Sequence, residues 1–406
     1  MSDPRRELLL ALLQAALARV DGRRCVRETL QADRGARSGD PVWLAAVGKA
    51  APAMALGAHD VLGANLAQLL VITRDCHAPS QLLALPNVEL IASAHPLPDE
   101  RSLRAGQRLL EWVDALPPTA QPLLLVSGGA SSLVEVLPAG TTLPDLERFT
   151  ARELAAGTAI GALNAQRIAR SCIKGGRLTA RLRGRAARAL FVSDVPGDDP
   201  ALIGSGLVGP ASEGADRVAR TVVASVAGAV AGAADAARAL RLTVHAPAQR
   251  FDGDAARLAA RFAHELRLSG SEVCVWGGES TVQLPPHPGR GGRNQHLALA
   301  AARLIAGQGD LMLLAAGTDG TDGVTEDAGA LVDADSCARI ALGGLDVDRC
   351  LSGADSGSAL AASGDLVHTG PTGTNVGDLV IGLKLSPEAA ARVVVAHRDA
   401  APARVL

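Results

Sequence analysis

Four carboxylates crowded into one glycine-rich loop are the residues of this chain best placed to do chemistry. The loop follows an apolar run that begins at Leu311, and its carboxylates are Asp319, Asp322, Glu326 and Asp327. Carboxylates this close repel one another unless a cation or a polar substrate compensates them. We therefore predict that Asp319 and Asp322 hold Mg²⁺ or contact a substrate hydroxyl. The alternative is a solvated loop that caps the next helix.

Three further loops have compositions suited to phosphate. Residues 127–132 (SGGASS) end an apolar run and offer backbone N–H groups and hydroxyls, the composition of an anion nest, although a tight turn explains this loop equally well. Residues 171–177 (SCIKGGR) set two cations around paired glycines, and residues 370–378 (GPTGTNVGD) combine glycines with hydroxyls. The residues predicted to bind substrate or phosphate are Ser127, Gly128, Gly129, Ser131, Lys174, Asn294, Thr372, Thr374 and Asn375.

Two other polar positions stand out by their place in the pattern. Arg293 and Asn294 precede an apolar helical stretch, so they fall in a first helical turn, where the helix dipole and the backbone N–H groups favour an anion. A surface salt bridge is the alternative for Arg293. Among the histidines we single out His95, in the segment SAHPLPD, because it lies where an apolar run ends.

The hydrophobic pattern predicts the frame that brings these loops together. Seven apolar runs each end in a polar loop and precede Ala-, Leu- and Arg-rich stretches at helical spacing, which indicates alternating strands and helices. These runs and their loops occupy residues 42–50, 69–75, 88–100, 122–132, 189–199, 272–280 and 311–323. Ligands of open parallel sheets bind beyond the carboxyl ends of the strands, so we expect the chemistry in these loops. Residues 211–270 read as Ala-rich helix with one short strand near 242–245.

Length and composition exclude several classes of protein. The chain has 406 residues, which indicates two or three domains, and its 48% hydrophobic and 20% charged residues suit a globular α/β protein. With four Phe, three Trp and no Tyr, it has few aromatic side chains on which bases could stack. The net charge of −2 supplies no general attraction for polyanions. We therefore expect small-molecule substrates and no nucleic-acid partner.

The same survey bears on the compartment. Six cysteines without a CxxC pair favour reduced thiols in a cytoplasmic protein. The first twenty residues carry polar side chains at helical spacing, which predicts an amphipathic helix from about Asp3 and not a targeting segment. The chain has no run of 18 apolar residues, so the sequence predicts no membrane span. The oligomeric state is left open, with a homodimer as one arrangement.

One tempting motif does not fit its usual role. Residues 204–209 (GSGLVG) match GxGxxG, but they come well after the run that ends at Val192, and Pro210 follows them. A dinucleotide-binding fingerprint needs its glycines directly between a strand and a helix. We therefore predict that this segment is not a nicotinamide site.

Read together, the loops resemble the class II glycerate 2-kinases, whose C-terminal part is called the MOFRL domain. The matching segments are VGKAAPAMA (47–55), AHPLPDE (94–100), SGGASSL (127–133), IKGGRL (173–178), SDVPGDDP (193–200), GGES (277–280), GRGGRNQ (289–295), AAGTDGTDG (315–323) and GDLVHTGPTGTNVGDL (364–379). They recur in the family's order and cover nearly the whole chain.

The resemblance implies ATP-dependent phosphorylation of the 2-hydroxyl of D-glycerate to 2-phosphoglycerate, with Mg²⁺, in a cleft between two domains. The family's reactive lysine falls on Lys49 and its arginine on Arg293. Asp194, or an Asp of the 319–322 loop, would hold Mg²⁺ or orient the attacking hydroxyl. The implied fold is a Rossmann-like three-layer α/β/α domain at residues 1–235, followed by a second α/β domain, which contains MOFRL, at residues 236–406.

Several positions depart from the family pattern, and they keep two other readings open. An Arg-Lys-His stretch is replaced by residues 167–169 (RIA), Val226 stands for an Asn, His296 for a Glu, and residues 354–357 (ADSG) for an asparagine-rich run. The alternatives are an NAD(P)H-dependent hydroxypyruvate reductase, with His95 as proton donor, and a catalytically weakened relative that binds a hydroxy acid or nucleotide.

Overall fold

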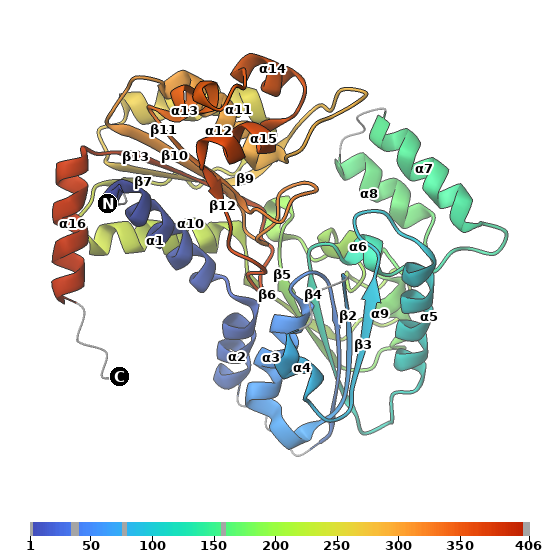
Figure 1. Cartoon of the computed structure of the whole chain (residues 1–406). Coiled ribbons are helices and arrows are strands. Elements are labelled where there is room, and N and C mark those ends of the chain that lie inside the picture. The colour runs from blue at the N-terminus through green and yellow to red at the C-terminus, as the bar shows by residue number, and fades with distance from the viewer. Residues whose placement is uncertain (1–2, 34–39, 75–78, 156–159, 401–406) are drawn as a thin grey trace. The chain divides into compact units, whose positions relative to one another are not determined.

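The computed structural model describes residues 3–33, 40–74, 79–155 and 160–400, and Cys76 therefore lies outside the described residues (Figure 1). The chain divides into two compact units that are discontinuous in sequence. The parallel-sheet unit consists of Val20–Ser225 and Gly373–Val376. The mixed-sheet unit consists of Met1–Arg19, Val226–Thr372 and Gly377–Leu406. The sequence predicts a single boundary after residue 235, and the structure differs from it in residues 1–19, in residues 226–235 and in the segment Gly373–Val376.

The parallel-sheet unit is a Rossmann-like layered fold, which confirms the predicted fold class. Its six strands run in the order β3-β2-β1-β4-β5-β6, and every neighbouring pair is parallel. Its strands are β1 (Val42–Val47), β2 (Leu66–Arg74), β3 (Val88–Ser93), β4 (Gln121–Ser127), β5 (Ala187–Val192) and β6 (Val218–Ala224). Its helices are α2 (Gly22–Ala32), α3 (Ala51–Leu62), η2 (Gly63–Asn65), α4 (Ser80–Leu83), α5 (Glu100–Asp114), α6 (Ala130–Leu133), α7 (Leu143–Ala155), α8 (Ile160–Ala169), α9 (Arg177–Arg181), η3 (Pro196–Asp198) and η4 (Ile203–Ser205).

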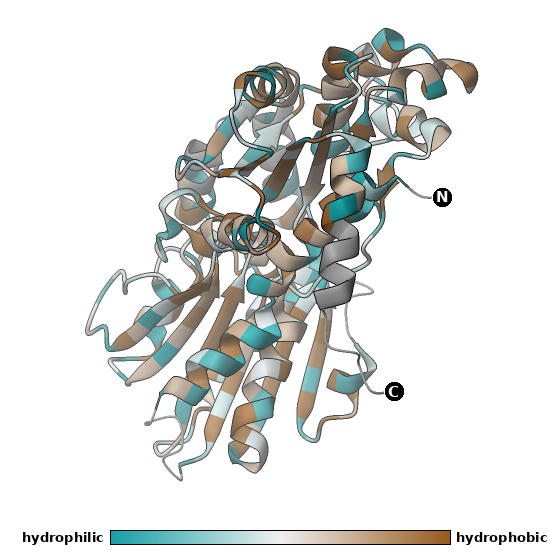
Figure 2. Cartoon of the chain, turned by 90° about the vertical axis from the view of Figure 1, so that its left-hand side faces the viewer, coloured by the Kyte–Doolittle hydropathy of each residue, from teal (hydrophilic) through white to brown (hydrophobic). Residues whose placement is uncertain are grey.

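Helices cover both faces of this sheet. Helices α2 and α3 pack on one face, and α5, α6 and α9 enclose the apolar core on the other. The strands are therefore buried on both sides, which explains why they read as continuous apolar runs such as VWLAAV in β1. Figure 2 shows the result: apolar residues follow the strands, and hydrophilic residues gather on the outer helix faces.

The mixed-sheet unit corrects one prediction from the hydrophobic pattern. Its sheet has the order β12-β11-β10-β13-β9-β7, with β8 beside β9, and β13 lies antiparallel between β9 and β10. Its strands are β7 (Val244–His245), β8 (Phe251–Asp254), β9 (Val273–Thr281), β10 (Leu311–Gly317), β11 (Gly329–Asp333), β12 (Leu366–Val367) and β13 (Asp378–Lys384). The expectation of a parallel sheet is wrong for this unit. Buried parallel and buried antiparallel strands both appear in sequence as unbroken apolar runs, so the pattern does not distinguish them.

Helices also cover both faces of the mixed sheet. They are α1 (Pro4–Arg19), α10 (Val226–Ala239), α11 (Ala255–Leu268), α12 (Arg293–Ile305), α13 (Ser336–Leu342), α14 (Val347–Ser352), α15 (Ser356–Ser363) and α16 (Pro387–Ala400). Helices α11 and α12 enclose a core in which the Phe262 and Trp276 rings stack at 4.7 Å. Helices α1 and α10 pack against each other and against β13. None of the helices in the described part of the chain is long and apolar enough to cross a membrane.

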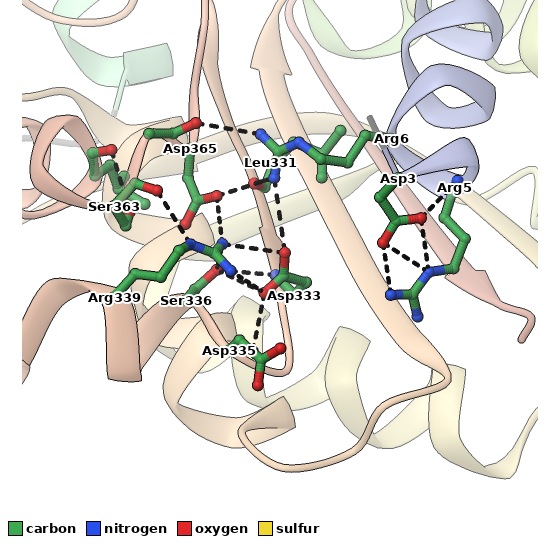
Figure 3. Close-up of polar contacts among 12 residues, drawn as sticks. Asp3, Arg5, Arg6, Leu331, Asp333, Asp335, Ser336, Arg339, Ser363 and Asp365 are labelled. Carbon is green, nitrogen blue, oxygen red and sulfur yellow. Dashed lines mark hydrogen bonds and ion pairs between the residues drawn. The ribbon is translucent and has the colours of Figure 1, made fainter. Parts of the chain in front are cut away.

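A buried ionic network anchors α1 in the mixed-sheet unit (Figure 3). Arg6 of α1 donates to Asp365 Oδ1 at 2.9 Å, and Arg339 donates to the same oxygen at 2.7 Å. Arg339 also donates to both oxygens of Asp333 at 3.0 Å. Asp365 is only 1% exposed, so it needs these cations to remain charged. This network explains why the first residues of the chain pack with its C-terminal part.

Candidate active site

The candidate site of the parallel-sheet unit lies where the strand order reverses. The chain moves from β1 outward to β2 and β3, and then returns to the other side of β1 with β4. In open parallel sheets, ligands bind at such a reversal, between the loops that lead away from the two strands. Lys49 follows β1, and residues 127–129 end β4. The backbone N–H of Lys49 donates to the carbonyl of Gly128 at 2.9 Å, which joins the two loops.

Ser127 builds this junction with its side chain. It is fully buried, and its Oγ accepts a hydrogen bond from the Ala50 backbone N–H at 3.0 Å. A Cβ atom on Gly48 would lie 2.1 Å from that hydroxyl, and the φ of Gly48 is +134°. The close approach of β4 therefore requires glycine at residue 48, directly before Lys49. The hydroxyl of Ser127, which the sequence predicts to bind substrate, holds the turn at Ala50, the residue after Lys49.

Asp194 and Asn375 meet at Gly128. A Cβ atom on Gly128 would lie 2.1 Å from Asp194 Oδ2 and 2.1 Å from Asn375 Nδ2. The Asn375 amide donates to Asp194 Oδ2 at 3.4 Å. Asn375 belongs to the short segment Gly373–Val376, which packs in this unit, and the Gly373 carbonyl accepts from the Gly22 backbone N–H at 3.1 Å. Residues that are far apart in sequence thus converge on one glycine.

His95 joins the same edge from the end of β3. A Cβ atom on Gly129 would lie 3.1 Å from His95 Cδ2, 3.3 Å from His95 Nε2 and 3.1 Å from Lys49 Cγ. The imidazole edge and the lysine stem therefore flank Gly129, which has a φ of +84°. The half-buried ring contacts the predicted phosphate loop, whereas the sequence supported only its position at a strand end.

Lys174 occupies a different environment from the one predicted. It is 1% exposed and forms an ion pair with Glu135, which is 2% exposed and also accepts from the Ser171 hydroxyl. Burial lowers the pKa of the Lys174 ammonium, and the Glu135 carboxylate opposes that shift. The ammonium thus compensates a buried carboxylate, whereas the sequence predicted a phosphate contact.

The GxGxxG segment at residues 204–209 packs against two of the loops that the sequence predicts to bind phosphate. The Gly175 and Gly176 backbone N–H groups donate to the carbonyls of Ser205 and Gly206 at 3.0 and 2.8 Å. The Ser205 hydroxyl shares a 2.7 Å hydrogen bond with that of Ser131. The segment therefore links the 171–177 loop to the 127–132 loop. Ser131, predicted to bind substrate, uses its hydroxyl in this link.

The candidate site of the mixed-sheet unit forms around Asp378, at the start of β13. This carboxylate is fully buried between the ends of β9 and β10. It accepts from Arg293 Nε at 2.9 Å, from a second Arg293 nitrogen and Asn294 Nδ2 at 3.0 Å, and from the Ser280 backbone N–H at 3.1 Å. Asp378 is therefore the residue around which the arginine is positioned.

Arg293 begins α12, as the sequence predicts, and a second carboxylate holds its guanidinium. Glu279 Oε1 accepts from Arg293 at 2.8 Å, in addition to the contacts with Asp378. Burial works against the charge on Arg293, but Asp378 and Glu279 outweigh it and raise the pKa of the guanidinium above its ordinary value. The side chain is 37% exposed, so a fixed cation reaches the surface of this unit.

Asp322 and Asp319 are engaged in local structure. Both oxygens of Asp322 accept hydrogen bonds from the start of α12, from the Asn294 and Gln295 backbone N–H groups at 3.1 and 2.8 Å. Asp319 Oδ1 accepts from the backbone N–H and the hydroxyl of Thr321, each at 3.0 Å. Asp322 thus caps a helix, but it is buried and the helix precedes the loop, whereas the sequence alternative was a solvated loop that caps the next helix. The described residues contain no group of three or more His, Cys, Asp or Glu side chains arranged to hold a metal ion.

The loop at residues 370–378 is divided between the units. Thr372 belongs to the mixed-sheet unit, where its hydroxyl donates to the Thr318 carbonyl at 2.5 Å. Thr374 and Asn375 belong to the parallel-sheet unit and are both buried. The sequence treats these residues as one phosphate loop, so the structure separates what the composition groups together.

Two residues important to these sites were missed as individuals. Glu279 and Asp378 both accept hydrogen bonds from Arg293. They lie in segments used for the family resemblance, GGES (277–280) and the end of GDLVHTGPTGTNVGDL (364–379), but neither residue was predicted to belong to a site. Asp378 is difficult to recognise because β13 was not predicted, and its role depends on the two strands beside it. His296, which departs from the family pattern, links α12 to α15: its Nδ1 lies 3.2 Å from the Ser356 hydroxyl.

The buried pair of Lys174 and Glu135 leads to a stability prediction. In Lys174→Met the Glu135 carboxylate stays buried without its cation, so we expect a loss of about 3–5 kcal/mol in the free energy of unfolding. The double variant Lys174→Met/Glu135→Leu removes both charges and should recover most of that loss. Urea denaturation of the three proteins measures these values. A loss below about 1 kcal/mol in Lys174→Met would contradict the structural role and favour the phosphate contact.

Asp322 leads to a prediction about pH. Burial raises the pKa of its carboxyl from 3.8 to about 6, so folding favours the protonated form. The stability that this contributes is complete below about pH 4 and is lost as the pH rises through 6. Between pH 4.5 and 7 we expect wild type to lose about 2 kcal/mol of unfolding free energy relative to Asp322→Asn. A wild-type-to-variant difference that stays constant across this range would show that Asp322 is ionised throughout.

Comparison with known proteins finds two family matches, one in each half of the chain. Residues 8–239 match a family described as a domain of unknown function (DUF4147), and residues 272–378 match the MOFRL family. The chain is 34% identical to the D-glycerate 2-kinase of Thermotoga maritima over 94% of this chain and all of that protein. It is 35% identical to a putative hydroxypyruvate reductase of Agrobacterium vitis, over 82% of this chain and 96% of that one.

A solved structure extends the agreement to the fold. The crystal structure of a glycerate kinase from Thermotoga maritima superposes with a TM-score of 0.82 at 32% identity, and the match covers 95% of this chain and all of that one. Sequence, family segments and fold therefore agree over nearly the whole length. The chain belongs to the class II glycerate 2-kinase family of MOFRL-containing proteins.

Proposed function

We propose that this protein transfers the γ-phosphoryl group of ATP to the 2-hydroxyl of D-glycerate, which yields 2-phosphoglycerate and ADP. The observation that carries the proposal is the meeting of Lys49, Gly128 and Gly129 at the point where the strand order reverses. Family membership supports the same reaction, because relatives that match nearly the full length of the chain are named glycerate kinases. A cytoplasmic location, where ATP is available, is part of this proposal.

Phosphoryl transfer asks little covalent chemistry of the protein. It requires positive charge against the phosphate oxygens and a fixed geometry for the attacking and leaving groups. The chain has three lysines, of which Lys174 pairs with Glu135 and Lys384 donates to the carbonyls of Arg267 and Ser269. Lys49 is the lysine that lies beside the glycine loop, where its ammonium can act as a mobile charge on the transferred phosphate.

Arg293 suits the recognition of an anionic group. Its guanidinium is held on Asp378 and Glu279 and remains 37% exposed, so it presents donors without having to reorganise. A planar fork binds a carboxylate or phosphate in two-point fashion, which a lysine cannot reproduce. We assign it to the carboxylate of glycerate or to a phosphate of ATP.

Position beside the strand-reversal site selects one carboxylate for Mg²⁺. When bound, the ion would neutralise charge on the ATP phosphates. It commonly takes one or two protein carboxylates and completes its shell with water and phosphate. Both oxygens of Asp322 accept backbone N–H groups, whereas Asp194 lies against the phosphate loop at Gly128. We therefore favour Asp194 over the predicted pair of Asp319 and Asp322.

The reductase alternative has a weaker physical basis. The turn between β1 and α3 reads Gly48-Lys49-Ala50, without the spaced glycines that a dinucleotide needs at this position. The GxGxxG segment at residues 204–209 instead leads from η4 toward β6 and packs behind the phosphate loop. A kinase therefore accounts for the strand-reversal site better than a nicotinamide enzyme does.

An assay of ADP formation across D-glycerate, L-glycerate, lactate and glycolate tests the proposal. We expect turnover with D-glycerate and a rise in melting temperature with ATP and Mg²⁺ but not with NADH. In Lys49→Met we expect kcat to fall on the order of 100-fold, because a charge used in the transition state is lost. In Arg293→Lys we expect kcat/KM below that of wild type, because an ammonium cannot replace the two-point contact of a guanidinium.

Controls make these outcomes specific. Lys384→Met removes a lysine of the same type outside both sites and should keep wild-type turnover. Hydroxypyruvate reduction by NADH, without ATP consumption on any acid of the panel, would reject the kinase in favour of the reductase. Wild-type activity in Lys49→Met would reject the role of that lysine.

The metal assignment has its own test. If Asp194 holds Mg²⁺, Asp194→Asn should raise the Mg²⁺ concentration for half-maximal activity at least about tenfold, because one anionic ligand is lost. Asp319→Asn and Asp322→Asn should leave that concentration unchanged. Measured Mg²⁺ titrations of the four proteins decide between them. The opposite pattern would return the metal to the glycine-rich loop at residues 319–322.

A further inference from the structure

His95 contacts the core of the candidate site, and the kinase reaction proposed above gives it no role. It follows β3, whose last residue, Ser93, donates through its hydroxyl to the Leu133 carbonyl at 2.7 Å. The loop then ends at Asp99, which caps α5 by accepting from the Arg101 backbone N–H at 2.7 Å. Both ends of the short loop that carries His95 are thus fixed to neighbouring elements. The loop therefore holds the imidazole next to Gly129.

The ring lies on the same glycine as the proposed phosphate-binding lysine. The Cδ2–Nε2 edge of His95 approaches the Cβ direction of Gly129 at 3.1 and 3.3 Å, and Lys49 Cγ approaches it at 3.1 Å. Any side chain at residue 129 would displace one of them. Gly129 therefore lets an imidazole nitrogen and an ammonium stem share one face of the loop.

Phosphoryl transfer to an alcohol also requires an acceptor for the hydroxyl proton. Asp194 is the nearby carboxylate, but Asn375 donates to its Oδ2, and it is the group we assign to Mg²⁺. A carboxylate engaged with an amide and a cation is a weak base, because both partners stabilise its charged form. An imidazole accepts a proton at neutral pH and releases it again, which suits repeated turnover.

On the basis of the function proposed above, we propose that His95 is the general base that accepts the proton of the substrate 2-hydroxyl. The hydroxyl O–H bond breaks as its proton passes to the imidazole Nε2. The freed oxygen forms a bond to the γ-phosphorus of ATP while the bond from that phosphorus to the bridging oxygen breaks, and the electron pair leaves with ADP. The imidazolium then returns its proton to water.

The charged groups on the surrounding elements bear on this role. They are Lys49 after β1, Arg74 at the end of β2, the Asp99–Arg101 pair at the start of α5, and Asp194 after β5. Lys49 and Arg74 are cations, and the Asp99 carboxylate is paired with Arg101 at 2.9 Å. These groups place charges of both signs on the elements around the imidazole.

Chemical rescue tests the proposal. In His95→Ala we expect kcat to fall by about 100-fold or more, the scale of general-base catalysis, while the melting-temperature rise with ATP is retained. Added imidazole should restore part of the rate in a saturable manner. Pyrazole, a ring of the same size and much lower basicity, should not. The control His264→Ala removes an exposed histidine of α11 and should keep wild-type turnover without responding to imidazole.

The remaining outcomes separate the inference from the function on which it rests. Equal rescue by imidazole and pyrazole would mean that the ring only fills space, and would overturn the proton role. That role is also overturned if His95→Asn, which keeps a polar side chain without basicity, retains wild-type kcat and its pH profile. Absence of D-glycerate-dependent ADP formation in wild type would instead overturn the proposed function, and the inference with it.

Discussion

The reversal of strand order beside β1 is the constraint on which the candidate active site depends. Crossovers from parallel strands are right-handed, so helices that follow β1 and β4 must lie on opposite faces of the sheet. Their first turns therefore separate, and the carboxyl ends of the two strands are left open to a ligand. The Lys49-to-Gly128 backbone hydrogen bond joins the two loops that follow these strands. Side chains from β3, β5 and the segment Gly373–Val376 then reach the same edge.

Buried carboxylates perform the second organising task. Asp378 holds Arg293, Glu135 holds Lys174, and Asp365 holds Arg339, and each of these carboxylates is at most 2% exposed. A charge removed from water is costly unless its partner is present in good geometry, so each pair tolerates few alternative arrangements. These pairs fix the positions of their side chains more than they raise the free energy of unfolding. The pairs of Asp378 and Glu135 include residues of predicted binding loops. Asp365 also accepts from Arg6 and so attaches α1.

Discontinuity of the two units has a physical basis in the apolar face of α1. Leu8, Leu9, Leu12 and Leu13 are buried, and the helix packs against α10. A helix with such a face must bury it against another apolar surface. The chain thus begins in the mixed-sheet unit, builds the parallel-sheet unit and then returns. Segment Gly373–Val376 repeats the exchange on a smaller scale and brings Asn375 to Asp194.

The sequence by itself determined those features that depend on near neighbours. Apolar runs ending in polar loops predicted β1 to β5 of the parallel sheet, whereas β6 lies in a stretch that the sequence predicted to be helical. The change from glycine to an apolar helical pattern predicted that Arg293 begins α12. The joint order of the loop motifs indicated the family. Each signal is carried within a few residues, because strand and helix periodicity, turns and caps are local properties.

Only the tertiary structure decided which side chains share a site. Lys174 looked like a phosphate ligand until Glu135, 39 residues earlier, was found beside it. Asp378 gained its role from strands on either side, whose antiparallel order the apolar runs do not encode. Asp322 became a helix cap by meeting α12. The physical reason is common to all three: a charged residue has the same sequence signature in a site, a cap or an ion pair, and its partner across the fold determines which it becomes.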